Sequence, residues 1–472
     1  MLMNWIKTHI VKCSAVLAFL AAFVFFQVAY PYHLMRREQM NLFLFDWDYI
    51  RETYRGVGWL ARFVCDFVDQ FFLLPVVGPL VVALLLTAIG VVVYRICRHF
   101  LGKWSSLGTA ALFYVWSFLR ETDNLFSTRY TLVLLAYLSL VLLALQARKA
   151  WMQGVAAAVL LAFGAWALGS PFHRYYGRPW GKPVITYDRV IGLDSEVSKE
   201  HWDKVIRLSK KDLHLLESSY CYNLAHAMKG DLARAFFNHS QESVRGLLLR
   251  VSTDKSAFSN CMAGEAWFQL GDMTLAEQSA IIMLQASPKH TGTRYLIRLA
   301  RANLISGEDG AAQKYLDLLS KTLFYGNWAK RMMPGNQDAA TVAELAESRE
   351  RLARTDFVHH SVEPRNILLG LLEADPENAL AREYLLVYDL LTFNLDDFAE
   401  EYALKKEDAP IFHEALLIWL SLQNEMTEAN AARYGIAPAM ISKMERFFIN
   451  PDRYRNTYWY FYLNAMLEDE EQ

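Results

Sequence analysis

The stretch Leu73–Tyr94, LLPVVGPLVVALLLTAIGVVVY, decides the fold of the first third of this 472-residue chain. It carries no charged residue from end to end. A helix of about 20 such apolar residues crosses the ~30 Å hydrocarbon core of a bilayer. The stretch therefore predicts a transmembrane helix.

Four further apolar runs lie before and after this stretch. The runs cover about residues 13–30, 104–119, 130–145 and 150–169. We expect five spans in a transmembrane helical domain of residues 1–172, with an amphipathic outer loop over 33–72. The runs 104–119 and 130–145 are near the lower length limit, so three spans with this pair as a re-entrant or interfacial hairpin is the alternative.

Charge divides the chain into two parts. Residues 1–180 carry 16 Lys+Arg and 8 Asp+Glu, whereas residues 181–472 carry 32 and 42. The formal net charge of −2 is therefore the sum of a basic, charge-poor front and an acidic, charge-rich back. Hydrocarbon excludes charge, which accounts for the front. The acidic back argues against a nucleic-acid partner.

Basic residues in the short turns predict the orientation. The turns 95–103 and 148–149 contain Lys and Arg but no acid, and such turns lie on the cytoplasmic side. With the N-terminus inside, five spans place residues 173–472 outside the membrane. We therefore expect a protein of the bacterial inner membrane with a periplasmic C-terminal domain; losing one span would place that domain in the cytoplasm.

A spacing pattern recurs in the back two thirds: Ala, four residues, then a turn residue, an acid and a further Ala. The pattern predicts helical hairpins, because the left-handed turn conformation suits Gly and is tolerated by Asn. The acid after it lies at the next helix N-terminus, where the helix dipole favours negative charge. The turn residues are Gly230, Gly271, Gly307, Asn394 and Asn424.

This pattern resembles the tetratricopeptide repeat, which also opens a helix with Asp-Pro-x-Asn, as in Asp375–Asn378. The resemblance implies an all-α chain in which a linker, 173–197, leads to a tetratricopeptide-like α-solenoid over 198–472. The periods depart from 34 residues and the tract from Gly307 to Asn394 is irregular, so the expected array is degenerate. An unrelated all-helical bundle with Gly and Asn turns is the alternative.

Two carboxylates in the first loop, Asp46 and Asp48, are candidate catalytic residues. Acids just after a first span resemble those of polytopic glycosyltransferases that use lipid-linked sugars. The resemblance implies that such acids act as a base or as metal ligands. The alternative is a solvated turn with an N-cap acid ahead of an interfacial helix.

The run Leu42–Leu80 with the repeat-like tail also resembles a family of uncharacterised bacterial multi-pass inner-membrane proteins. That family implies no activity.

The five cysteines show no metal-binding spacing, and we expect neither a metal nor a cofactor. Cys221 and Cys261 fall nine and ten residues before Gly230 and Gly271, at nearly equivalent sites of adjacent repeats. They are either a disulfide or two buried small hydrophobes.

Together these patterns predict a membrane-anchored scaffold whose repeat domain binds a protein or peptide partner at the cell envelope. We expect binding rather than catalysis. The alternative function is a membrane enzyme, or an accessory subunit, of lipid-linked sugar transfer that uses Asp46 and Asp48.

Overall fold

The computed structural model describes residues 2–470 apart from residues 57, 124–126, 147–150, 156–157, 160–161, 163–182, 242, 253–256, 351 and 353–362. Every regular element within the described residues is a helix. The all-α prediction is therefore confirmed.

The chain forms two compact units. Unit 1 comprises residues 1–191, 287–294 and 318–328, and unit 2 comprises residues 192–286, 295–317 and 329–472. The chain thus passes between the units five times. Two short segments distant in sequence, 287–294 and 318–328, therefore belong to the fold of the apolar front.

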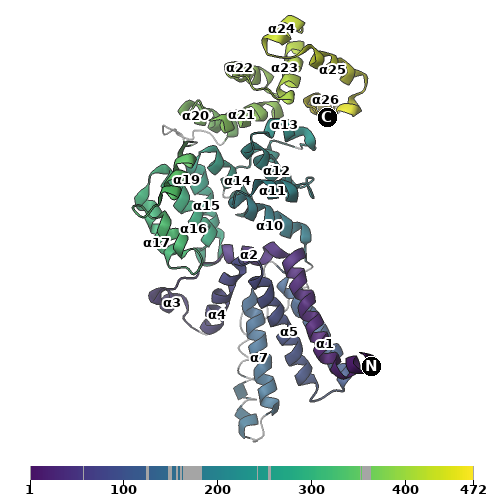
Figure 1. Cartoon of the computed structure of the whole chain (residues 1–472), viewed down its shortest axis with the longest axis vertical. Helices are drawn as coiled ribbons and strands as arrows, with labels where there is room; N and C mark the ends of the chain where they lie inside the picture. The colour runs from purple at the N-terminus through teal and green to yellow at the C-terminus, as the bar shows by residue number, and fades with distance from the viewer. Residues whose placement is uncertain are drawn as a thin grey trace. The chain divides into compact units, whose positions relative to one another are not determined.

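Unit 1 is built on long helices that run side by side (Figure 1). Helix α1 (Leu2–Val24) continues through a π-helical turn, and α5 (Val77–Cys97) packs against it. Helices α6 (Lys103–Glu121) and α7 (Thr128–Gln146) both pack against α5. Helix α5 is therefore the centre of the bundle.

Three helical stretches within the described residues are long and apolar enough to cross a membrane: His9–Ala29, Val77–Cys97 and Thr128–Gln146. The predicted number of five spans was therefore wrong, since three such stretches lie within the described residues. The run 104–119 forms α6, which is less apolar because its inward face carries Ser106, Ser117 and two charged residues. Most of the run 150–169 lies outside the described residues.

The loop expected over 33–72 folds into short helices. These are α2 (Pro31–Gln39), α3 (Trp47–Thr53), α4 (Trp59–Asp69) and a 3₁₀ turn (Gln70–Leu73). The expected linker, 173–197, contains helix α10 (Ile185–Ser198); its residues 173–182 lie outside the described residues.

Unit 2 contains pairs of consecutive helices that pack together, with α11 against α12, α14 against α15 and α20 against α21. Helices α10, α16, α17 and α18 lie only partly in unit 2. The helices that follow α10 are α11 (Trp202–Ser209), α12 (Leu216–Met228), α13 (Leu232–Ala235), α14 (Ala257–Leu270), α15 (Met273–Ala286), α16 (Thr293–Ser306), α17 (Asp309–Ser320), α18 (Gly326–Met332), α19 (Ala339–Glu350), α20 (Pro364–Ala374), α21 (Ala379–Leu391), α22 (Leu395–Leu404), α23 (Pro410–Leu422), α24 (Glu428–Arg433), α25 (Pro438–Ile449) and α26 (Tyr458–Glu470).

Four of the five turn residues have the left-handed conformation expected of them. The backbone φ is 71° at Gly230, 95° at Gly271, 81° at Gly307 and 58° at Asn424. Asn394 instead has φ −81° and is the N-cap residue of α22. The left-handed residue there is the preceding one, Phe393, with φ 59°.

The core of unit 2 joins helices that are far apart in sequence. Helices α12 and α13 contact α21, and α13 also contacts α23. The Asn378 side chain donates to the carbonyl oxygen of Leu270 at 2.9 Å, and Glu383 accepts the backbone N–H of Ala233 at 2.9 Å. In a simple solenoid each repeat contacts only its sequence neighbours. The predicted solenoid is therefore not confirmed, because the helices after residue 363 pack onto those before residue 272.

Candidate functional site

Unit 1 contains a buried polar cluster, which we define as Arg37, Glu38, Asp66, Asp69, Glu121 and Lys289. The side chains come from α2, α4, the end of α6 and the segment 287–294. Four acids and two bases are gathered there. Burial of charge is costly unless each charge is paired or hydrogen-bonded. We therefore expect each charged side chain of the cluster to be paired or hydrogen-bonded.

Arg37 and Glu121 form the central ion pair of the cluster. Arg37 Nη1 donates to Glu121 Oε2 at 2.8 Å, and the Glu121 side chain is fully buried. Nη1 also donates to Thr128 Oγ1 at 2.7 Å, and Nη2 donates to the Glu121 backbone carbonyl at 3.0 Å. The second carboxylate oxygen of Glu121 accepts from the hydroxyl of Thr131. The pair therefore ties α2 to the end of α6 and the start of α7.

Asp66 is surrounded by donors. Its Oδ1 accepts from Asn41 Nδ2 at 3.0 Å, and its Oδ2 accepts from Tyr54 Oη at 2.8 Å. Lys289, more than 200 residues later in the chain, forms an ion pair with the same Oδ2. Asp66 therefore fixes the segment 287–294 against α4.

Asp69 is the member with the fewest donors. The Cys65 thiol, one helical turn earlier, donates to its Oδ2 at 3.6 Å, and its Oδ1 has no hydrogen-bond partner among the described residues. Burial raises the pKa of Asp69 to about 7, and the nearby Arg37 guanidinium opposes that rise. Burial likewise raises the pKa of the Cys65 thiol well above its usual range. Burial therefore favours the neutral form of Asp69 over its charged form.

Glu38 accepts a hydrogen bond from the second distant segment, 318–328. Tyr325 Oη donates to Glu38 Oε2 at 2.9 Å, and Thr293 Oγ1 donates to Oε1 at 3.3 Å. A cavity of about 10 Å³, close to the volume one water needs, lies among Glu38, Asn41 and Tyr325. Burial, followed by the charge of Glu38, raises the pKa of Tyr325 well above its usual range.

The group Cys65, Asp66 and Asp69 has ligand atoms within 4.8 Å of one another, as a metal site would. The donors argue against a metal here. Both oxygens of Asp66 already accept from neighbours, and one of these neighbours is the ammonium group of Lys289. A divalent ion would have to share Asp66 with that cation. We therefore interpret the group as part of an internal ion-pair cluster.

A further buried acid, Asp188 of α10, caps the N-terminus of α2. Its carboxylate accepts the backbone N–H of His33 at 2.7 Å and of Tyr32 at 3.3 Å. A helix N-terminus has unpaired N–H groups and favours negative charge. Burial raises the pKa of Asp188 to about 7, against the lowering effect of these two N–H donors.

Asp46 and Asp48 do not converge on one site. Asp46 is the N-cap of α3, where its Oδ1 accepts the backbone N–H of Tyr49 at 3.0 Å. Its Oδ2 forms an ion pair with Lys321 at 2.6 Å, and this hydrogen bond lowers the pKa of Asp46. Asp48 is exposed in the first turn of the same helix. This arrangement matches the N-cap interpretation of the motif.

Cys221 and Cys261 are both thiols in the structure rather than halves of a disulfide. They are buried in different hydrophobic clusters, Cys221 in the main core of unit 2 and Cys261 beside Met283 and Tyr295. This arrangement is that of two buried small hydrophobes.

A Ser–His contact in unit 2 has the residue types of a nucleophile and its base. Ser219 Oγ and His239 Nε2 are 2.8 Å apart, beside a cavity of about 240 Å³. However, Gln241 Nε2 also donates to His239 Nε2, at 3.1 Å. Burial lowers the pKa of His239 to about 4, and its Nδ1 has no partner within the described residues that would orient the ring. A base with so low a pKa is poorly matched to catalysis near pH 7.

Sequence reasoning missed the buried polar cluster. Asp66 and Asp69 lie in WLARFVCDFVD, an otherwise apolar, aromatic stretch just before the span at Val77. Acids placed in such a stretch are costly unless paired, and this cost was the available signal. The partners Lys289 and Tyr325 gave no signal, because nothing local connects them with α2 or α4.

Comparison with known proteins identifies a family but no activity. No curated protein and no solved structure matches the chain. A family model matches residues 6–177 and 173–465, which is nearly the whole chain. The chain therefore belongs to DUF6057, a family of unknown function.

Proposed function

We propose that this protein is a membrane-anchored scaffold, in which unit 1 lies in the bacterial inner membrane and unit 2 presents helical surface to a protein or peptide partner. The observation that carries the membrane part is the packing of helix α6 in unit 1. Helix α6 buries Ser106, Ser117 and Glu121 but leaves Leu112 and Val115 exposed. Such packing is unfavourable in water and favourable in lipid.

Helix α4 supports the same proposal. It buries Asp66 and Asp69, whereas Trp59 and Leu60 are exposed. Trp47 of α3 is 77% exposed. Aromatic side chains concentrate where a membrane meets water. Helices α3 and α4 therefore fit an interfacial position, and α6 fits a helix embedded beside the three spans with its polar face covered by its neighbours.

The scaffold role is favoured over lipid-linked sugar transfer by the positions of Asp46 and Asp48. The carboxylate of Asp46 is used by the α3 N-terminus and by Lys321. A scaffold needs its binding unit joined to its anchor, and the chain passes between the two units five times. With the basic, acid-free turn 95–103 inside, unit 2 lies in the periplasm under this proposal.

Two experiments test this function. In cells lacking the gene, the Asp46→Asn, Asp48→Asn double variant should restore the phenotype as well as the wild type does. Loss of function with normal membrane levels would favour the enzyme. In whole cells, photo-cross-linkers at exposed positions of α22 and α25 should give one defined adduct with an envelope protein, and the absence of any adduct from either helix would contradict the scaffold role.

A further inference from the structure

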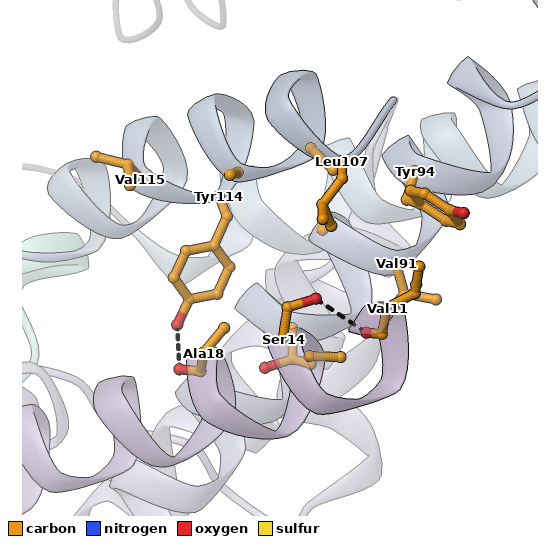
Figure 2. A pocket seen from close by; sticks show the side chains of 13 residues that line it. Val11, Ser14, Ala18, Val91, Tyr94, Leu107, Tyr114 and Val115 are labelled. Atoms are coloured by element: carbon orange, nitrogen blue, oxygen red, sulfur yellow. Dashed lines mark hydrogen bonds between the residues drawn. The ribbon is translucent and has the colours of Figure 1, made fainter. Parts of the chain in front are cut away.

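A long, narrow groove runs between α1, α5 and α6 in unit 1, and Figure 2 shows it from close by. Its volume is about 160 Å³, and its lining is almost entirely apolar. It extends from Val11 to Ala18 on α1 and from Leu107 to Val115 on α6. At 1.5 Å per residue, these stretches are about 10–12 Å long. The groove is therefore parallel to the helix axes.

Small residues keep the groove open, and two of its hydroxyl groups are hydrogen-bonded to backbone carbonyls of α1. Ala15, Gly90 and Ala111 line it where larger side chains would fill it. The Tyr114 hydroxyl donates to the Ala18 carbonyl at 2.6 Å, and the Ser14 hydroxyl donates to the Val11 carbonyl at 3.1 Å. Figure 2 shows both hydrogen bonds along the α1 wall of the groove. The hydroxyls of Tyr114 and Ser14 are therefore satisfied locally, and Thr87 Oγ1 is the lining hydroxyl that has no hydrogen-bond partner among the described residues.

One end of the groove lies beside a concentration of positive charge. Val11, Tyr94 and Leu107 line that end. The chain adjacent to them carries Lys12, Arg95, Arg98 and Lys103, and residues 70–120 contain no acid. Lys12, Arg95 and Arg98 are exposed. Basic clusters at the membrane end of helices attract anionic headgroups.

We propose that the groove binds one acyl chain of an anionic phospholipid, whose phosphate is held by the basic residues at that end. This inference rests on the proposed membrane location of unit 1. The shape selects a single hydrocarbon chain lying along the helices. The charge selects an anionic over a zwitterionic headgroup, because each Lys or Arg near a headgroup changes the affinity about fivefold.

The test uses the purified full-length chain in mild detergent, with native mass spectrometry after addition of phosphatidylglycerol or phosphatidylethanolamine with the same acyl chains. The wild type should retain phosphatidylglycerol at least about fivefold better. Ala111→Trp should fill the groove and abolish retention, whereas Leu112→Trp, on the adjacent exposed position of α6, should not. Ala111→Leu replaces the Trp variant if size-exclusion chromatography shows that the latter misfolds.

A charge series tests the headgroup contact. The double variant Arg98→Gln, Lys103→Gln should lose at least about fivefold of the phosphatidylglycerol preference. Arg51→Gln, an exposed arginine of α3, should keep it. Equal retention of both lipids by the wild type, or equal retention by the Ala111 and Leu112 variants, would overturn the inference. Release of the chain from membranes by alkaline carbonate would instead overturn the proposed function itself.

Discussion

Helix α6 of unit 1 and helix α23 of unit 2 bury their apolar side chains to different extents. Helix α6 buries Ser117 and Glu121 and exposes Leu112. Helix α23 buries Phe412 and Leu416 together with one acid, Glu414, which pairs with Lys443 at 2.9 Å. Although α23 is an apolar helix, it is too short to be a span, and its buried side chains belong to the core of unit 2. Which side chains a helix exposes thus indicates its solvent more directly than its mean hydropathy does.

Burial also differs between two ion pairs, one taken from each unit. In unit 1 the pair Arg37–Glu121 is buried and shared with two threonines. In unit 2, Arg455 and Asp452 form an exposed pair at 2.7 Å within one turn. Buried pairs fix structure because an unpaired buried charge is costly, whereas exposed pairs contribute little.

The largest expected effect comes from breaking the buried pair. Glu121→Ala leaves the guanidinium of Arg37 buried without its carboxylate, and we expect a loss of about 3–5 kcal/mol in the free energy of unfolding. Thermal and denaturant unfolding in detergent would measure it. Asp452→Ala is the control and should leave the stability unchanged within error. Similar losses of unfolding free energy in the two variants would mean that the Arg37 guanidinium becomes hydrated when Glu121 is removed.

A charge on an exposed leucine should distinguish the two units next. Leu112 is 75% exposed in unit 1, and Leu404 is 70% exposed in unit 2. Leu112→Lys should disfavour membrane insertion by about 2.5–3.5 kcal/mol, whereas Leu404→Lys should change the stability by less than about 0.5 kcal/mol. The inserted fraction after alkaline carbonate extraction reports the first effect, and denaturant unfolding reports the second. If Leu112→Lys inserted as fully as the wild type, residue 112 would face water and not lipid.

Two helical glycines give a smaller, steric contrast. A Cβ on Gly264 would lie 2.6 Å from Ser279 Cβ on the adjacent helix, whereas one on Gly90 would lie 3.6 Å from Tyr114. Gly264→Ala should therefore destabilise by about 1–3 kcal/mol through overpacking. Gly90→Ala should be neutral or stabilising by up to about 1 kcal/mol, because Ala favours helix. Unfolding curves of both variants test this, and the reverse order of stability would contradict the packing described.

The smallest expected effect is the change in the free energy of unfolding that Asp69 causes over one pH unit. Its pKa is raised from 3.8 unfolded to about 7 folded, so the folded state binds the extra proton between these values. Its contribution is fully present below pH 4 and is lost as the pH rises towards 7, by at most about 1.4 kcal/mol for each pH unit. Asp69→Asn removes this dependence. The stability difference between the two proteins at pH 6 and pH 7 measures it, and parallel profiles would exclude a raised pKa.

The features that could be predicted from the sequence are those that depend on residues close together in the chain. The run at Val77–Cys97 forms an apolar helix, and Gly230, Gly271 and Gly307 have the expected positive φ. At Asn394 the prediction fails by one residue, because Phe393 takes the left-handed conformation and Asn394 becomes the N-cap. Local spacing cannot separate these two ways of ending a helix pair.

The buried polar cluster could not be predicted in the same way. Asp66 meets Lys289, and Glu38 meets Tyr325, only because segments 287–294 and 318–328 fold with the apolar front. The packing of α12 and α13 onto α21 likewise depends on contacts over more than 140 residues. Such pairings follow from tertiary packing, which neither the hydropathy pattern nor the turn spacing contains.

Helix α6 buries its polar face and exposes Leu112, and lipid exposure of Leu112 tests its place in the membrane most directly. In native membranes, a fluorophore on Leu112→Cys should be quenched by brominated lipid, and the cysteine should react slowly with a membrane-impermeant maleimide. Leu404→Cys should show the opposite behaviour, with the five native cysteines replaced by serine in both proteins. Rapid maleimide labelling of Leu112→Cys without lipid quenching would show that α6 faces water, and would contradict the account.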